Sequence, residues 1–136
     1  MNYLLDTSIC IALINDNPAT ARAKYNHAIG ALSTIYVSSI SLFELWYGVS
    51  KSKRREFDTA MLAGFLSGSV RRLAFEAEDA PVTGELRVAL EAVGRRIGEY
   101  DTLIAGQALR HGLTLVTANT REFGRIKNLS CENWSQ

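Results

Sequence analysis

The sequence predicts an α/β fold with a central, mainly parallel sheet. Short runs of apolar and β-branched residues alternate with longer segments of helical periodicity, which is typical of strands that are connected by helices. The chain has 136 residues, of which 47% are hydrophobic. A chain of this length fits one domain, residues 1–136, whose core needs neither a disulfide nor a structural metal.

The first half of the chain is expected to contain two strands and four helices. Thr7 or Ser8 can cap the first helix. Asn17 and Pro18 are expected to place a cap and a first-turn proline at the start of the second helix. The expected elements are strands at 2–5 and 35–39 and helices that begin after Asp6, at about Pro18, at Ser41 and at Ser52, the last three ending near Leu32, Gly48 and Leu66.

The second half is expected to supply the remaining strands. The segment 113–117 has the clearest strand pattern of the chain, and 129–134 is expected to add a short edge strand. A further strand is expected at 70–75. Long helices are expected over 77–96 and from Asp101 to just before Gly112, and no repeat or flexible linker divides the chain.

Composition and charge exclude several classes of protein. The formal net charge is +1 at pH 7, so attraction to nucleic acid has to come from local clusters of basic residues. The two cysteines, Cys10 and Cys131, have no metal-ligand spacing, and Cys10 is expected to be a buried free thiol. No segment is apolar over the roughly 18 to 20 residues that span a bilayer. We therefore expect a cytoplasmic protein that does not enter a membrane.

Acidic and amide side chains follow several of the expected strands. Asp6 comes directly after the first strand, Glu44 lies in the helix after the second, and Asn119 follows the strand at 113–117. Asp101 begins the helix that leads into that same strand. Because parallel strands place their carboxyl ends at one edge of the sheet, where ligands bind, these side chains are expected to converge.

Converging carboxylates repel one another and resist desolvation. A divalent cation removes both problems, and ligands that are all oxygen favour Mg²⁺, with Mn²⁺ as its substitute. Asp6, Glu44 and Asp101 are therefore candidate metal ligands and catalytic residues, and Asn119 is a fourth catalytic candidate.

Each of these residues also has an ordinary structural interpretation. Asp6 can simply cap a helix. Ser41 and Glu44 match the capping box, in which the glutamate folds back onto the serine amide. Asp101 can interact with the dipole of its own helix, and Asn119 can be an ordinary turn residue. The joint placement, rather than any single residue, favours a metal site.

Four blocks of the sequence carry a family resemblance. They are LDTS at 5–8, SSISLFELWYG at 38–48, IGEYDTLIA at 97–105 and LVTANTREF at 115–123. In order and spacing they resemble the PIN-domain nucleases and, more narrowly, the VapC toxins of bacterial toxin–antitoxin pairs. The likeness extends from the first strand to Glu132-Asn133-Trp134.

The resemblance implies a three-layer α/β/α sandwich and a Mg²⁺-dependent endoribonuclease that hydrolyses RNA phosphodiester bonds. Carried over by position, it makes Asp6, Glu44 and Asp101 the metal-binding acids and places Asn119 at the fourth position. Glu122 follows Asn119 by three residues, and the resemblance leaves open whether it reaches the site.

The resemblance also implies partners. Family members often cut structured RNAs such as tRNA, with initiator tRNA as a plausible target here. It further implies a toxin homodimer, a higher hetero-oligomer with a VapB-like antitoxin, and a groove that receives an antitoxin segment.

Basic and aromatic side chains are the candidates for contacts with these partners. Most of the aromatic residues are expected in the core, although an exposed Trp46 or Phe65 would fit the groove. Glu99 either adds an acid near the pocket or faces solvent. The basic candidates for RNA phosphates are 51–55, Arg95, Arg96, Arg121, Arg125 and Lys127, and the aromatic residues in question are Trp46, Tyr47, Phe57 and Phe65.

Two alternatives compete with a toxin. One is a PIN nuclease that processes RNA without an antitoxin. The other is a non-catalytic α/β binding module that uses Asp6 as part of an acidic pocket. No GxxxxGK[ST] loop occurs, which argues against nucleotide hydrolysis of that type.

Overall fold

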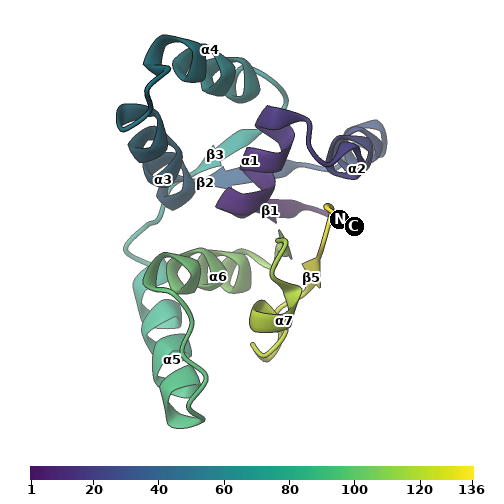
Figure 1. The fold of residues 1–136 in the computed structure, drawn as a ribbon. Helices are drawn as coiled ribbons and strands as arrows, with labels where there is room; N and C mark the ends of the chain where they lie inside the picture. The colour runs from purple at the N-terminus through teal and green to yellow at the C-terminus, as the bar shows by residue number, and fades with distance from the viewer.

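The computed structural model describes residues 1–136 and contains one five-stranded sheet in the order β3-β2-β1-β4-β5, with every neighbouring pair parallel (Figure 1). The α/β prediction is therefore confirmed. The strands are β1 (Tyr3–Leu5), β2 (Ile35–Ser38), β3 (Arg71–Leu73), β4 (Thr114–Val116) and β5 (Cys131–Glu132). The helices are α1 (Thr7–Asn15), α2 (Ala19–Gly30), α3 (Ser39–Ser50), α4 (Arg55–Leu66), α5 (Asp79–Ala92), α6 (Glu99–His111) and α7 (Thr120–Phe123).

The sheet separates two hydrophobic clusters, which gives the molecule three layers. Helices α1 to α4 cover one face of the sheet, whereas α5, α6 and α7 cover the other (Figure 1). Successive strand residues point to opposite faces, so Leu4 belongs to one cluster and Leu5 to the other. Leu115 and Val116 divide in the same way. The predicted α/β/α sandwich is confirmed.

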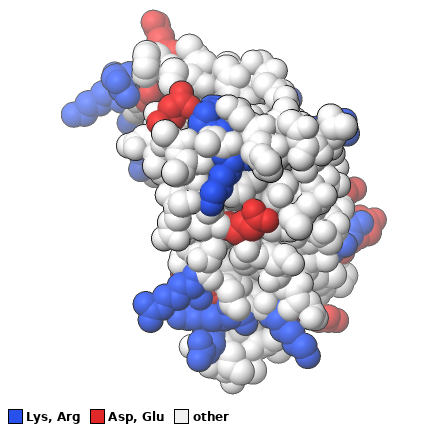
Figure 2. Space-filling view, turned by 90° about the vertical axis from the view of Figure 1, so that its right-hand side faces the viewer, with Lys and Arg blue, Asp and Glu red and all other residues white.

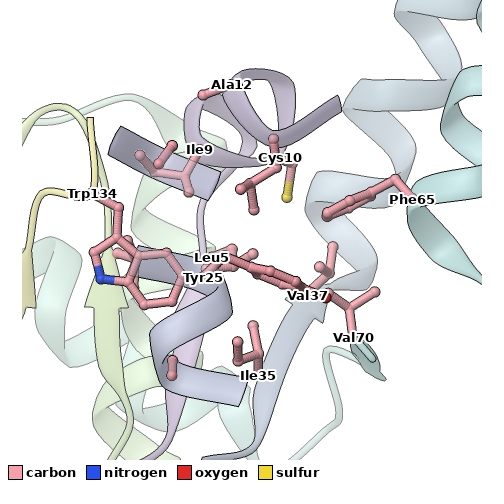
Figure 3. Packing of buried hydrophobic residues seen from close by; sticks show 14 of the residues in the cluster. Leu5, Ile9, Cys10, Ala12, Tyr25, Ile35, Val37, Phe65, Val70 and Trp134 are labelled. Carbon is pink, nitrogen blue, oxygen red and sulfur yellow. The ribbon is translucent and has the colours of Figure 1, made fainter. Parts of the chain in front are cut away.

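The cluster beneath α1 holds the sheet to the first four helices (Figure 3). Leu5, Val37 and Cys10 are fully buried there, and Tyr25 and Phe65 close its sides. Burying a large apolar side chain contributes about 1.5–3 kcal/mol to folding. Cys10 has no exposed surface and forms no disulfide, as the apolar run around it predicts.

Three helices have N-terminal caps that differ from the predictions. Asp6, rather than Thr7 or Ser8, caps α1, because its carboxylate accepts a hydrogen bond from the Ile9 amide at 3.0 Å. Pro18 is itself the residue before α2, so it does not lie in the first turn, and no side chain caps that helix.

The third difference concerns α3, which begins at Ser39 and is capped by Ser38. The Ser38 hydroxyl accepts from the Ile40 amide at 3.0 Å. Ser41 therefore lies inside the helix, and the capping box of Ser41 and Glu44 is wrong. The Glu44 carboxylate is free to take another partner.

In the second half of the chain, α5 is shorter than predicted and α7 is an additional short helix. Helix α6 ends at Gly112, whose left-handed φ of 63° suits glycine. Strand β5 is an edge strand, as expected. No helix is long and apolar enough to cross a membrane.

Candidate active site

The candidate site lies at the carboxyl edge of the sheet beside β1, where the order of the strands reverses. Strand β1 has β2 on one side and β4 on the other. The residues that follow these strands therefore lie next to one another, which is where ligands bind in open α/β sheets. Helix α6 brings its first turn to the same edge.

Asp6 is buried at the centre of this edge, with 5% of its surface exposed. Its Oδ1 accepts hydrogen bonds from the Ser8 hydroxyl at 2.6 Å and from the Ile9 amide. Burial raises the pKa of Asp6, and hydrogen bonds from Ser8, Thr117 and Ile9 partly offset that rise. The capping role and the acidic role thus belong to the same side chain.

Glu44 reaches the site from the middle of α3. The Thr7 hydroxyl donates a hydrogen bond to its Oε1 at 2.7 Å. This bond joins the first turn of α1 to α3 and replaces the capping interaction that the sequence suggested. A charge-assisted bond of this kind holds the carboxylate in place.

Asp101 lies in the first turn of α6 and is half-buried. Desolvation is the largest cause that raises the pKa of Asp101, to about 6, and the charges of Asp6, Glu44 and Glu122 raise it further. A carboxyl group feels its neighbours this strongly only when they are close. Together with the hydrogen bond from Thr7, next to Asp6, to Glu44, this places the three acids that the sequence singled out at one edge of the sheet.

Asn119 lies at the rim of the site rather than within it. Its side chain is exposed and donates a hydrogen bond to Oε2 of Glu122 at 2.7 Å. The charge of Glu122 is the smallest of the causes that raise the pKa of Asp101, so Glu122 lies on the same side of the sheet as that acid. Asn119 orients this fourth acid.

Thr117 contacts the site, whereas Glu99 does not. The Thr117 hydroxyl accepts a hydrogen bond from the Asn119 amide at 2.9 Å and also bonds to Asp6. Sequence reasoning missed Thr117, although a polar residue that ends a buried strand is a usable signal. Glu99 faces solvent and lies 3.9 Å from Arg96.

The donor set fits a hard divalent cation, although it does not form a complete cage. No three Asp, Glu, His or Cys side chains lie close enough together to bind one ion directly. Mg²⁺ needs only one or two direct carboxylates, because it keeps several of its waters. All the candidate ligands are oxygens, and a cation would relieve the repulsion that raises the pKa of Asp101.

A groove lies beside the acids, between α1, α3 and α4. It has a volume of about 270 Å³, and Glu44 lies at its wall. The rest of its lining is mainly apolar, with Ile11, Phe57 and Met61 partly exposed.

The prediction that most of the four aromatic candidates on α3 and α4 lie in the core was wrong. Phe65 is buried, but Trp46, Tyr47 and Phe57 are 42%, 58% and 53% exposed. They lie on α3 and α4, whose other faces already fill the core, so helical spacing alone could not place them.

Basic residues form separate groups on the surface. Figure 2 views the side that carries α2 and the chain ends, opposite the carboxyl edge of the sheet, and Lys and Arg gather along the lower part of that face, where Figure 1 places α5 and α7. Arg121, Arg125 and Lys127 belong to α7 and the loop after it, directly beyond Asn119. These three side chains are therefore the basic candidates that follow the carboxyl end of β4 most closely in the chain.

Comparison with known proteins places this geometry in a family. The PIN domain model matches residues 3–129. The chain belongs to the PIN-domain family. It is 45% identical to "Ribonuclease VapC2" of Rickettsia felis over 100% of both chains. It is also 41% identical to "tRNA(fMet)-specific endonuclease VapC" of Shigella flexneri over 99% of both.

Solved structures agree with the sequence relatives. The chain superposes with a TM-score of 0.92 and 44% identity on a chain of the VapBC2 complex of Rickettsia felis bound to promoter DNA, covering 98% of this chain and 99% of that one. A chain of the DNA-bound VapBC of Salmonella typhimurium gives a TM-score of 0.89 at 37% identity, with 98% of each chain covered. The predicted membership in the VapC group of PIN-domain ribonucleases is confirmed.

Proposed function

We propose that this chain is a Mg²⁺-dependent endoribonuclease toxin that hydrolyses tRNA and is inhibited by a VapB-type antitoxin. The observation that carries the proposal is the convergence of Asp6, Glu44 and Asp101 at the carboxyl edge of a PIN-domain sheet. Their mutual repulsion supports a cation at this place, with Mn²⁺ as a substitute for Mg²⁺.

The residues of the chain divide the work in this site. Asp6, Asp101 and Glu44 would hold the cation, with at least one of them acting through a water of its shell, because the three do not lie close enough together to bind it directly. When bound, the cation would act as a Lewis acid that activates water and neutralises charge on the phosphate. Thr7 orients Glu44, and Asn119 orients Glu122.

The substrate class rests on the relatives. One curated relative is named for cleavage of tRNA(fMet), and it is similar to this chain along its whole length. We extend that substrate, initiator tRNA, to this chain as a proposal. Arg121, Arg125 and Lys127 would meet phosphates on one side of the acids.

The groove between α1, α3 and α4 fits an antitoxin segment. Its apolar lining suits the apolar face of a helix, which is one of the standard modes of peptide recognition. Glu44 at its wall suits a basic side chain of the antitoxin. The related structures are VapBC complexes, which supports a VapB-type partner. We extend the proposal to a toxin homodimer within a larger assembly with the antitoxin.

The test is cleavage of total tRNA by the purified chain, in Mg²⁺ and in EDTA, with mapping of the cut ends. Asp6→Asn is the variant of choice, because asparagine keeps the cap of α1 and removes the charge. Asp16→Asn is the matched control, since Asp16 is an exposed carboxylate at the opposite end of the same helix. Discrete cuts that need Mg²⁺ and vanish only in Asp6→Asn would support the proposal.

Other outcomes would redirect it. Cuts that Asp6→Asn retains would place the active site elsewhere. Intact tRNA, mRNA and rRNA under all conditions would favour the non-catalytic binding module. If the protein cleaves RNA but is not inhibited by the product of a small adjacent gene, the RNA-processing nuclease is favoured.

A further inference from the structure

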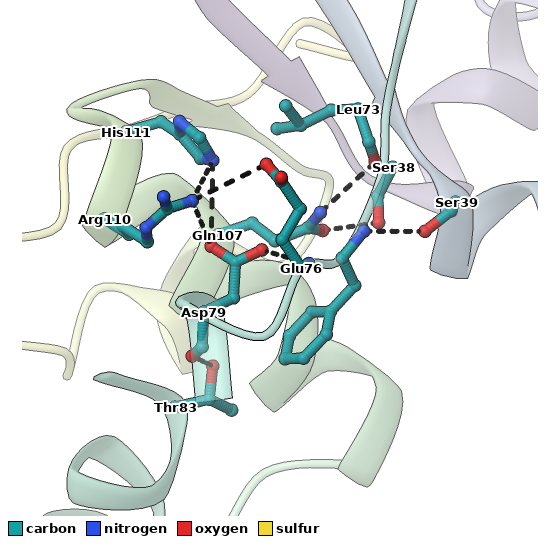
Figure 4. A network of polar contacts seen from close by, with 10 residues as sticks. Ser38, Ser39, Leu73, Glu76, Asp79, Thr83, Gln107, Arg110 and His111 are labelled. Atoms are coloured by element: carbon teal, nitrogen blue, oxygen red, sulfur yellow. Dashed lines mark hydrogen bonds and ion pairs between the residues drawn. The ribbon is translucent and has the colours of Figure 1, made fainter. Parts of the chain in front are cut away.

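Gln107 is a fully buried polar side chain that the proposed chemistry does not use. It lies on α6, six residues after Asp101, and none of its surface is exposed. Its Oε1 accepts a hydrogen bond from the Ser38 hydroxyl at 2.5 Å, and its Nε2 donates to the Leu73 carbonyl at 3.2 Å (Figure 4). Both ends of the amide are therefore satisfied inside the protein.

The Ser38 hydroxyl connects two helices that carry acids. It caps α3 by accepting from the Ile40 amide, and it donates to Gln107 on α6. Helix α3 carries Glu44 and helix α6 carries Asp101. One hydroxyl and one amide thus join the start of the first helix to the body of the second.

The contact with Leu73 adds a third element to this junction. Leu73 is the last residue of β3. Two residues later, the Phe75 amide donates to the Ser39 hydroxyl at 3.0 Å, so the chain that leaves β3 is also held against α3 (Figure 4). Gln107 therefore fastens α6 to the carboxyl ends of β2 and β3, the same edge at which the acids converge.

The other polar side chains of α6 point to different partners. Arg110 contacts Asp79 at 3.0 Å, which ties the far end of α6 to α5. Thr102 donates to the Gly98 carbonyl, which is local. Gln107 is accordingly the side chain of α6 that forms a hydrogen bond on the α3 side of the site. Helices α3 and α6 also meet through an edge-to-face contact between the rings of Phe43 and Tyr100.

We infer that Gln107 is a positioning residue that sets the separation of Asp101 and Glu44 by fixing α6 against the start of α3. This inference rests on the proposed function, because it assigns the residue to the same acidic site. Removing the amide leaves the Ser38 hydroxyl and the Leu73 carbonyl buried without their partner, which costs free energy unless the helices move. A shift of about 1 Å in a reacting group can lower a rate about 100-fold.

The test compares Gln107→Leu with Leu90→Ala. Leucine keeps most of the volume and removes both hydrogen bonds. Leu90 is a buried residue of α5 in the hydrophobic cluster that α5 and α6 share, so its truncation lowers stability without touching this junction. For each protein we would measure the single-turnover cleavage rate, the Mn²⁺ affinity by calorimetry, and the free energy of unfolding in urea.

We expect Gln107→Leu to cleave roughly 10- to 100-fold more slowly and to bind Mn²⁺ about tenfold more weakly, the range seen when groups that support metal ligands are removed. Leu90→Ala should lose stability and keep a rate and Mn²⁺ affinity within about threefold of the unsubstituted protein. A Gln107→Leu protein with unchanged rate and Mn²⁺ affinity, or with losses that Leu90→Ala reproduces, would overturn the inference.

Ser38→Ala breaks the same hydrogen bond from the other side and carries the test if Gln107→Leu does not fold. The double variant Ser38→Ala/Gln107→Leu should be no slower than the slower single variant by more than about twofold, because the bond that joins the two helices is already lost in each single variant. Fully multiplicative losses would overturn the inference. If the unsubstituted protein neither cleaves RNA nor binds Mn²⁺, the proposed function is overturned and this inference falls with it. If the unsubstituted protein is active and the variants are unaffected, this inference alone is overturned.

Discussion

The Thr7 hydroxyl donates a 2.7 Å hydrogen bond to Oε1 of Glu44, and this contact joins α1 to α3 at the acidic site. It explains why Glu44 is available to the site although it follows Ser41 at capping-box spacing. The helix starts earlier, at Ser39, so the glutamate lies beyond the turn in which it could cap.

Thr7→Val should therefore lower cleavage without unfolding the protein. Valine keeps the shape of threonine and removes the donor, so Glu44 loses the bond that fixes it, and we expect a roughly tenfold higher Mg²⁺ requirement or slower rate. Thr7→Ser, which keeps the hydroxyl, should behave as the unsubstituted protein. A titration of the cleavage rate with Mg²⁺ measures both, and equal titrations for Thr7→Val and Thr7→Ser would show that the hydroxyl has no such role.

Substitution can separate the role of Asp6 as the cap of α1 from its role as an acid of the site. Asp6→Asn should abolish Mg²⁺-dependent cleavage and keep the stability of α1, because the amide oxygen can still accept from Ile9. Asp6→Ala should also abolish cleavage and lose about 1 kcal/mol of cap stabilisation in addition. Urea unfolding of the two variants gives the difference. Equal stability of the two would mean that the cap contributes nothing measurable.

Asp101 should make stability depend on pH. Its pKa is raised to about 6 in the folded protein, above its ordinary value of 3.8, so folding favours the protonated carboxyl. The folded state then binds more protons between these values, and in EDTA the free energy of unfolding should fall as pH rises from about 4 to about 6. Other acids contribute as well, so the difference from Asp101→Asn isolates this residue.

Asp101→Asn should consequently melt at a higher temperature than the unsubstituted protein at pH 7 in EDTA, with a smaller difference at pH 5. Saturating Mg²⁺ should raise the melting temperature of the unsubstituted protein more than that of the variant, because the cation relieves the repulsion. A variant that is less stable than the unsubstituted protein at neutral pH would contradict this account.

Gly106 marks the closest approach of α5 and α6. A Cβ atom there would lie 2.0 Å from Oγ1 and 2.9 Å from Cβ of Thr83, and 3.3 Å from its Cα. Gly106→Ala should push the helices apart and destabilise the protein by about 1–3 kcal/mol. Gly84→Ala on α5 is the control, since nothing lies within 4 Å of a Cβ there, and helix propensity predicts a gain of about 0.5–1 kcal/mol. Thermal unfolding distinguishes the two, and similar effects would refute close packing at Gly106.

Arg121 and Arg125 should contribute to RNA affinity through phosphates. The double variant Arg121→Ala/Arg125→Ala should bind tRNA more weakly and reduce the slope of log affinity against log salt by about 1–2, at about 0.7–0.9 for each lost phosphate contact. Arg71→Ala/Arg72→Ala is the charge-matched control, because β3 forms the opposite edge of the sheet from β5. If the control lowers the slope as much, the effect is one of net charge and not of position.

Much of the site followed from sequence because its residues come directly after strands. Asp6 after β1 and Asn119 after β4 had to meet at the carboxyl edge once the strands were parallel. The order of the four blocks fixed the family in the same way. Helix ends were less predictable, because Ser38, Ser39 and Ser41 are all competent caps and their spacing does not distinguish among them.

The sequence by itself determined the α/β class, the alternation of strands and helices, and the set of acids, since these depend on local periodicity and on chain order. Only the tertiary structure decided that Glu44 bonds to Thr7 and that Gln107 joins α6 to Ser38. These partners are far apart in the chain or separated by an irregular turn. Which of many polar groups meet is set by how the helices pack on the sheet, because burial makes each unpaired group costly and so selects one arrangement.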